Sequence, residues 1–362
     1  MVRRVTTNGM MMSYKTNLMS SYKMLGQISE KMTTQRNFNS YAESPAKASQ
    51  AFQLRRERWN TETQITNSKY VTHKFQQAWN CMENLYQDLG NSKVKYSDLL
   101  AQNGTQGSGR KALGDVILGA ADAAVQTLNS KFGERFIFSG ADGDTVPFSW
   151  GENANGDRIL LYRGMPVDEV TPELEATLKE TTYVDLGMGM SENNNGELIS
   201  SSAFNTAITG LDILGYGKSD YTYTDKAGNQ KVVKVVKDVP NNLVSVFNEL
   251  GSIWAQADPD SGALPNGEED MARIEALEHK LQEGLDQLHE RYVTLDTQAA
   301  FVKTNQTRLE GLDDTLNEQI VDMEDIDPAD AITSLMWAQY SYNAALRIGT
   351  NLLSQSLIDY MN

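Results

Sequence analysis

The sequence has little of several residue types that catalytic and metal sites need. Its 362 residues include one cysteine, Cys81, and three histidines, His73, His279 and His289. A single cysteine excludes an internal disulfide framework and a four-cysteine zinc site. No histidine lies three or four residues from another, the spacing of a metal-binding pair on a helix. We therefore expect no catalytic residues, no cofactor, no metal site and no enzymatic activity.

Positive charge and long apolar runs are also scarce. Lys and Arg number 32 against 48 Asp and Glu, which gives a net charge of −16. Nucleic-acid binding depends on cationic side chains, so no nucleic-acid partner is expected. Polar residues interrupt every stretch long enough to span a bilayer, and the N-terminus has no continuous apolar core followed by small residues. No membrane partner, small-molecule substrate or cleavable signal peptide is expected.

The last 32 residues form a segment almost without charge. Between Ala331 and Asn362 only Arg347 and Asp359 are charged. Apolar side chains recur at heptad spacing, with others beside that row, at Ile332, Leu335, Leu346, Leu353, Leu357 and Tyr360. Such a period predicts a helix. Because a surface helix carries a charged face, this helix is expected to be surrounded by other protein helices.

The N-terminal segment mirrors the C-terminal one. Met11, Leu18, Leu25 and Met32 repeat every seven residues, with Ile28 in an alternate slot. We expect both ends of the chain to form one coiled pair that is incomplete without neighbouring molecules. The expected assembly interface consists of Met11, Leu18, Leu25, Ile28, Met32, Ile332, Leu335, Leu346, Leu353, Leu357 and Tyr360.

Two long helices of matching length are predicted inside these ends. Ser44 and Pro45 are a typical helix start, and apolar residues at three- and four-residue spacing continue to Leu100. A second such pattern runs from Met271 to Met323. Helices of this length, one from each half of the chain, favour antiparallel pairing.

The segment between them is rich in Gly, Asn, Asp, Thr and Val. Ile159–Tyr162 is expected to be a strand, and Tyr221–Thr224 with Lys231–Val236 a hairpin. The predicted fold class is α+β, a long antiparallel helical hairpin with a mostly β insert. The expected division begins with an N-terminal assembly helix (1–40) and the first half of the helical hairpin (41–135). A β-rich outer domain (136–240), the second half of the hairpin (241–325) and a C-terminal assembly helix (326–362) follow.

Several motifs resemble the flagellin family, in particular its hook–filament junction proteins. The similar stretches are Arg4–Asn8, Lys131–Gly140, Met323–Ile332, Tyr342–Leu346 and Ser356–Tyr360. Two stretches of the insert, Tyr183–Met190 and Gly210–Gly217, are similar to junction proteins of Gram-positive bacteria. One departure lies at Asn37–Pro45, where the family's acidic pair is missing.

This resemblance implies a structural protein of the bacterial flagellum, exported without a cleavable signal through the flagellar type III channel. It would form the junction between hook and filament by self-assembly through its terminal helices. The implied partners are its own copies in a ring, the neighbouring hook-associated protein, flagellin and an export chaperone. Alternatives are flagellin itself, the coiled-coil tip protein of an injection needle, and an enzyme with its site in the β insert.

Overall fold

The computed structural model describes residues 7–103, 107–196, 198–199, 203–227 and 230–361, so part of the Arg4–Asn8 motif lies outside it. Within these ranges it does not describe the side chains of 7–8, 102–103, 107–108, 223–227, 230–234 and 352–361. The chain divides into two compact units. The terminal unit comprises residues 1–63 and 309–362, and the central unit comprises residues 64–308.

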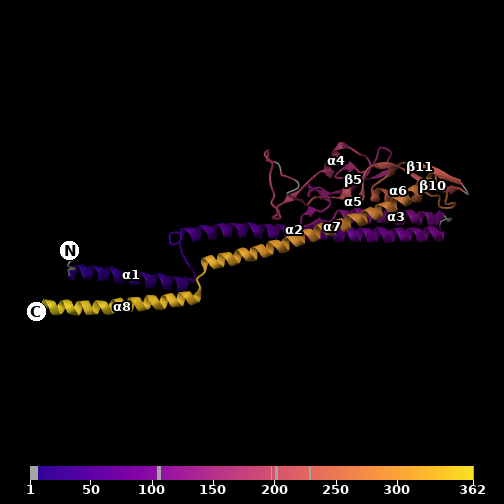
Figure 1. Ribbon diagram of the computed structural model, residues 1–362. Coiled ribbons are helices and arrows are strands. Elements are labelled where there is room, and N and C mark those ends of the chain that lie inside the picture. Colours follow the sequence, from indigo (N-terminus) through magenta and orange to yellow (C-terminus); the bar gives the residue numbers. More distant parts are fainter. Residues whose placement is uncertain (1–6, 104–106, 197, 200–202, 228–229, 362) are drawn as a thin grey trace. The chain divides into compact units, whose positions relative to one another are not determined.

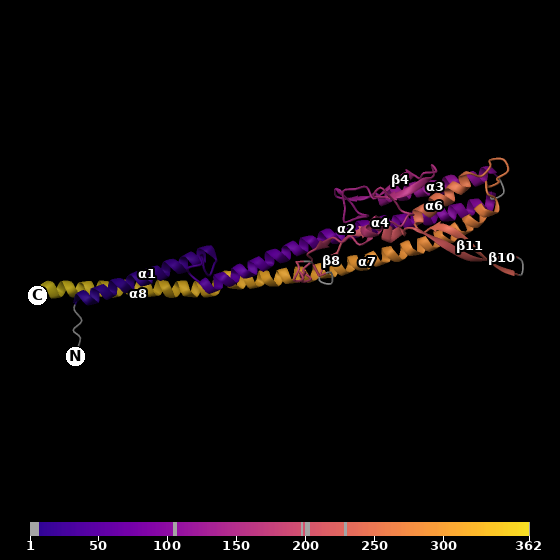
Figure 2. The same ribbon diagram turned by 90° about the horizontal axis from the view of Figure 1, so that it is seen from above.

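Four long helices account for much of the chain (Figures 1 and 2). They are α1 (Thr7–Thr34), α2 (Pro45–Asn103), α7 (Glu268–Glu324) and α8 (Pro328–Met361). A proline opens both α2 and α8, where its fixed φ suits the first helical turn and its missing N–H leaves no bond unmade. The predicted helix start at Pro45 is thus confirmed. Helices α2 and α7 each run through both units.

The central unit adds shorter helices to these two. They are α3 (Gly107–Leu128), α4 (Pro172–Leu178), α5 (Gly210–Leu214) and α6 (Leu243–Ala255). Asn242 caps α6, because its side chain accepts hydrogen bonds from the backbone N–H groups of Val244 and Ser245. Helix α6 then lies closely against α3.

Small antiparallel sheets recur through the insert. Strands β4 (Phe148–Glu152), β5 (Arg158–Tyr162) and β6 (Met165–Pro166) form one sheet, and β10 (Lys218–Ala227) pairs with β11 (Gln230–Pro240) in the predicted hairpin. Two-residue strands form the pairs β1–β2, β3–β9 and β7–β8: Lys131–Phe132 with Arg135–Phe136, Ser139–Gly140 with Ile208–Thr209, and Tyr183–Val184 with Phe204–Asn205. The predicted strand at Ile159–Tyr162 is therefore confirmed, and the hairpin strands are longer than expected.

The insert and the helices of the central unit share one hydrophobic core. Phe138, Phe148 and Tyr162 of the insert belong to the same buried cluster as Leu85 of α2 and Phe247 of α6. Polar contacts also join them: Lys74 Nζ donates to the Thr206 carbonyl at 2.8 Å, and Asn305 Nδ2 to the Leu186 carbonyl at 2.6 Å. The insert therefore depends on the helices for part of its core.

The predicted α+β class, with long antiparallel helices and a β-rich insert, is confirmed. Tyr96 on α2 donates to Glu278 on α7 at 2.6 Å, and the rings of Tyr86 and His289 lie 5.4 Å apart, so the two helices run antiparallel in the central unit. The finer division into five segments stays a prediction.

The close contact between α3 and α6 gives a first test of the core. A Cβ atom on Gly114 would lie 2.7 Å from the Ala255 nitrogen, and neither backbone can move away cheaply. We expect Gly114→Ala to lower the free energy of unfolding by about 1–3 kcal/mol, measured by urea denaturation. Gly119, on the same helix, has no atom within 4 Å of that position, so Gly119→Ala should raise the free energy by up to about 1 kcal/mol. Equal effects of the two changes would contradict this view of the contact.

Candidate assembly interface

Helices α1 and α8 form an antiparallel pair in the terminal unit. The rings of Tyr22 and Tyr342 lie 6.0 Å apart. The loops that follow α1 and precede α8 are joined by backbone hydrogen bonds, from Asn37 N to the Glu324 carbonyl at 2.7 Å and from Ile326 N to the Gln35 carbonyl at 3.1 Å. The predicted pairing of the two chain ends is therefore present within one molecule.

Small residues of α8 face α1. Ala331, Ala338 and Gly349 are buried, although most of the other described side chains of α8, within 328–351, are exposed. A Cβ atom on Gly349 would overlap the Tyr14 hydroxyl group. Because these residues have little or no side chain, the two backbones approach closely and the larger side chains of α8 are left outside the contact.

The N-terminal residues of the expected interface divide into two groups. Leu18, Leu25, Ile28 and Met32 of α1 are partly buried at helical spacing, as expected for residues along the contact with α8. Met11 is 48% exposed and lies outside this contact. Its place in the expected interface thus depends on other molecules.

The C-terminal residues fall mostly outside the contact with α1. Ile332 is 50% exposed and Leu346 is 39% exposed, whereas Leu335 is partly buried. The row through Ile332 and Leu346 therefore does not face α1, because the small-residue row, one position away, does so instead. The side chains of Leu353, Leu357 and Tyr360 lie outside those that the structure describes.

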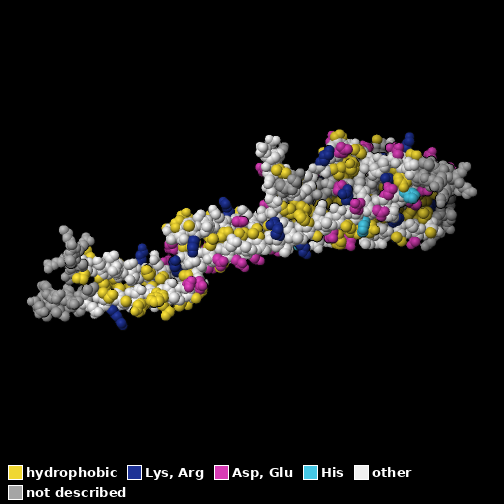
Figure 3. Space-filling model, viewed as in Figure 1, with side chains coloured by type: hydrophobic (Ala, Val, Ile, Leu, Met, Phe, Trp, Pro, Cys, Tyr) yellow, Lys and Arg dark blue, Asp and Glu magenta, His cyan; other side chains and the backbone are white. Residues whose placement is uncertain are grey.

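The sequence pattern pointed to only some of the large apolar side chains that are exposed on this pair. They lie between the heptad rows on both helices: Met12, Met19, Tyr22, Met24, Met336, Trp337, Tyr340 and Ile348. Figure 3 shows hydrophobic side chains gathered over α1 and α8. The low charge of the segment was the signal that could have identified them, since few charged residues separate one apolar side chain from the next.

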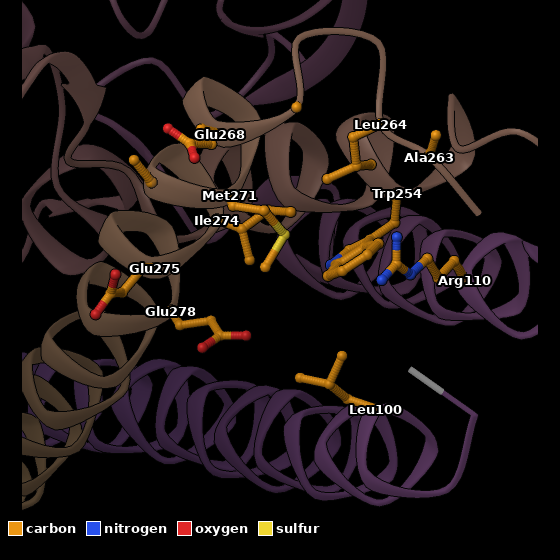
Figure 4. Close-up of a pocket in the computed structure, with 12 residues that line it drawn as sticks. Leu100, Arg110, Trp254, Ala263, Leu264, Glu268, Met271, Ile274, Glu275 and Glu278 are labelled. Carbon is orange, nitrogen blue, oxygen red and sulfur yellow. The ribbon is translucent and has the colours of Figure 1, made fainter. Parts of the chain in front are cut away.

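A cavity of about 930 Å³ lies in the central unit between α2, α3, α6 and α7 (Figure 4). The Arg110 guanidinium lies 5.7 Å from the centre of the Trp254 ring and donates to the Gly262 carbonyl. Trp254 Nε1 donates to the Tyr96 hydroxyl at 3.0 Å, and that hydroxyl donates to Glu278. These polar groups therefore join helices to one another, and they present neither a nucleophile nor its base.

The remaining candidate groups do not form a chemical site in the described part of the chain. Cys81 is a buried free thiol on α2, and the three histidines are exposed. Among the described residues, no three His, Cys, Asp or Glu side chains are arranged to hold a metal ion. In those same ranges no helix is both long enough and apolar enough to cross a membrane.

Comparison with known proteins finds similarity in structure alone. No protein-family model and no curated protein sequence matches the chain. The crystal structure of flagellar hook associated protein-3 from Legionella pneumophila is similar with a TM-score of 0.51 and 11% identity, over 75% of this chain and 98% of that one. This chain has the hook-associated protein fold.

Two further solved structures were found with lower scores. FlgL from Xanthomonas campestris has a TM-score of 0.46 and 12% identity, over 71% of this chain and 97% of that one. FlgL from Bacillus cereus has a TM-score of 0.40 and 15% identity, over 74% of this chain and 99% of that one.

Within this hook-associated fold, the terminal pair and the central core should differ in local stability. The side chains along the α1–α8 contact are mostly half-buried, and two helices alone are marginal in water. We expect backbone amides of 9–34 and 328–351 to exchange rapidly in the free monomer. The segments 75–89 and 277–288 contain several fully buried side chains, so their backbone amides should exchange slowly. Slow exchange throughout both terminal helices in a hydrogen-exchange experiment would contradict this expectation.

The carboxyl group of Asp168 lies where its negative charge is poorly solvated. Burial raises the pKa of Asp168 to about 6 from 3.8, and the charge of the neighbouring Lys218 only partly offsets that rise. Asp168 Oδ1 and Ser245 Oγ are both buried without a hydrogen bond in the described structure. The folded state therefore favours the protonated form of Asp168 more than the unfolded state does.

The sign of the effect on stability follows from the raised pKa. Between pH 3.8 and about 6 the folded state binds more protons at Asp168 than the unfolded state, so this group's contribution to stability falls as the pH rises. Asp168→Asn removes the charge. The free energy of unfolding of the variant should exceed that of the wild type by roughly 1–3 kcal/mol at pH 7.5. This difference should become much smaller near pH 4, where Asp168 is protonated in the folded state and partly protonated in the unfolded state. Urea denaturation at both pH values measures this, and a difference independent of pH would show that Asp168 is ordinarily solvated.

Proposed function

We propose that the protein is a structural component of the bacterial flagellum that forms the junction between hook and filament. The observation that carries the proposal is the α1–α8 pair, whose outward side is apolar in a chain with the hook-associated fold. Trp337 is 66% exposed and Met336 is 65% exposed. Monomeric soluble proteins rarely expose such side chains close together, so these mark a surface that another protein covers.

The size of the exposed set fits assembly rather than incidental exposure. Each large apolar side chain that passes from water to a protein interior contributes about 1.5–3 kcal/mol. Several such residues on each terminal pair would together offset the loss of rotational and translational freedom on association. The assembly interface would include the outward residues Met11, Ile332 and Leu346, beside Leu18, Leu25, Ile28, Met32, Leu335, Leu353, Leu357 and Tyr360.

Further features of the proposal concern partners and location. The protein would act as an extracellular part of the flagellum, in a ring of its own copies between a second hook-associated protein and flagellin. Export in extended form suits terminal helices that gain most of their burial on assembly, and an export chaperone would cover them beforehand. The chain's single thiol is consistent with a secreted protein that folds without disulfides.

A pair of matched substitutions tests the role of the terminal helices. Leu346 is 39% exposed, so Leu346→Asp should leave the melting temperature of the monomer almost unchanged. In the assembly the same change would bury an unpaired carboxylate in every copy, at a cost of several kcal/mol each, so incorporation into flagella should fail.

Leu309→Asp is the control, because Leu309 is 1% exposed on α7 and should be needed by the monomer itself. The melting temperature of the Leu309→Asp variant should fall by more than about 10 °C. A loss of several kcal/mol in the free energy of unfolding gives a shift of this size in a chain of this length. If Leu346→Asp instead unfolds the monomer, α8 belongs to an ordinary core. If Leu346→Asp is incorporated as well as the wild type, the outward side of α8 is not the interface. Growth of the wild type into long filaments, rather than short rings, would favour flagellin.

A further inference from the structure

Helices α2 and α7 of the terminal unit expose surfaces of opposite character. On α2, Phe52 is 69% exposed and Trp59 is 67% exposed, and exposed Arg56 lies between them at helical spacing. We call Phe52, Arg56, Trp59 and Thr63 the aromatic–basic stripe. On α7, exposed Asp314, Glu318 and Asp322 follow one another every four residues and form the acidic stripe.

The two stripes lie at different edges of the two-helix layer, and Trp59 also borders an open groove beside Ile320 and Val321 of α7. Buried Thr61 lies on the opposite side of α2 from the aromatic–basic stripe, and buried Leu309, Leu316 and Ile320 lie on the opposite side of α7 from the acidic stripe. Figure 3 shows hydrophobic and basic side chains along the beginning of α2 and acidic ones along the end of α7.

The two stripes also lie at the same level along the length of the antiparallel α2–α7 pair. Arg58 Nε donates to Asp313 at 3.0 Å, and Arg55 pairs with Glu324, so the ion pairs between α2 and α7 bracket the level of Arg56 and Glu318. Each helix thus presents its stripe at one edge of the same two-helix layer.

Charge makes the two edges complementary. Residues 45–63 carry four basic and two acidic side chains, whereas residues 309–324 carry six acidic side chains and no basic one. Arg56, Glu318 and Asp322 form no ion pair among the described residues, and Asp314 is paired only through its proximity to Arg58. In a chain of net charge −16, two copies repel except where a basic patch of one meets an acidic patch of the other.

We infer that the aromatic–basic stripe of one copy docks on the acidic stripe of a second copy of this chain. This inference rests on the proposed self-assembly and names its lateral contact. The contact joins two different surfaces, so it repeats head to tail and closes into a ring when the rotation between copies permits. A rotation axis parallel to α2 and α7 brings the two stripes together at equal height. Phe52 and Trp59 supply the apolar part of the contact, and Arg56 meets Glu318 or Asp322.

A charge swap tests the contact through residues that the monomer does not need. Arg56→Glu and Glu318→Lys should each weaken self-association at least tenfold, measured by sedimentation velocity at low ionic strength and by incorporation into flagella. Carrying both changes in one chain presents the same contact with its charges exchanged, so the double variant should return to within about threefold of the wild type. Added salt should weaken wild-type association, since screening acts on exposed pairs.

Matched controls separate this contact from a general effect of charge. Lys95→Glu on α2 and Glu290→Lys on α7 make the same charge changes at exposed positions outside the stripes and should have no effect. Trp59→Ala should weaken association without lowering the melting temperature. All variants should melt within about 2 °C of the wild type, because single surface substitutions change stability little.

The outcomes distinguish the inference from the function on which it rests. If the wild type neither associates nor enters flagella, the proposed function is wrong. If the wild type does so and both single charge changes are harmless, the function stands and the stripes are not its lateral contact. If the single changes weaken assembly and the double variant fails to recover, the two stripes do not meet, and the inference is again overturned.

Discussion

The size of the side chains where two helices meet decides how closely those helices approach, and most of this structure depends on that constraint. Ala331, Ala338 and Gly349 bring α8 close to α1, and Gly114 and Gly251 bring α3 close to α6. Between α2 and α7 of the central unit, aromatic rings such as Tyr86 and Tyr292 fill the contact instead, at 5.9 Å. Where small residues form a helix contact, the larger side chains beside them stay outside it. Where large residues form the contact, they bury their own surface there.

This difference explains why the two kinds of contact serve different purposes. The central unit buries many large side chains fully, among them Phe75, Met82 and Trp254, so its stability lies within the single molecule. The α1–α8 pair buries small residues and exposes large ones, so much of its apolar area is still available for another molecule. A marginal contact within the monomer and an exposed apolar surface are therefore two consequences of the same choice of residues.

In the proposed docking between copies, charge would supply the specificity that apolar burial lacks. The terminal helices carry little charge, whereas α2 and α7 of the terminal unit carry separate basic and acidic edges. Apolar burial has no preferred direction, so it does not by itself set the order or height of neighbouring copies. Complementary charges do, because a wrong register places like charges together. Half-buried Asp168, by contrast, gives up stability at neutral pH without any evident gain in the described structure.

The sequence alone determined the four long helices, their order and the class of the fold. Heptad and three–four spacing predicted α1, α2, α7 and α8, and Pro45 marked a helix start that the structure confirms, because proline acts locally on its own turn. Periodicity could not decide which row of α8 faces α1, since Ala331 and Ile332 are adjacent and only the partner helix selects between them. The core shared by Phe138 and Phe247 and the placement of Arg56 and Glu318 at different edges were likewise decided by tertiary structure, because each depends on residues far apart in the chain.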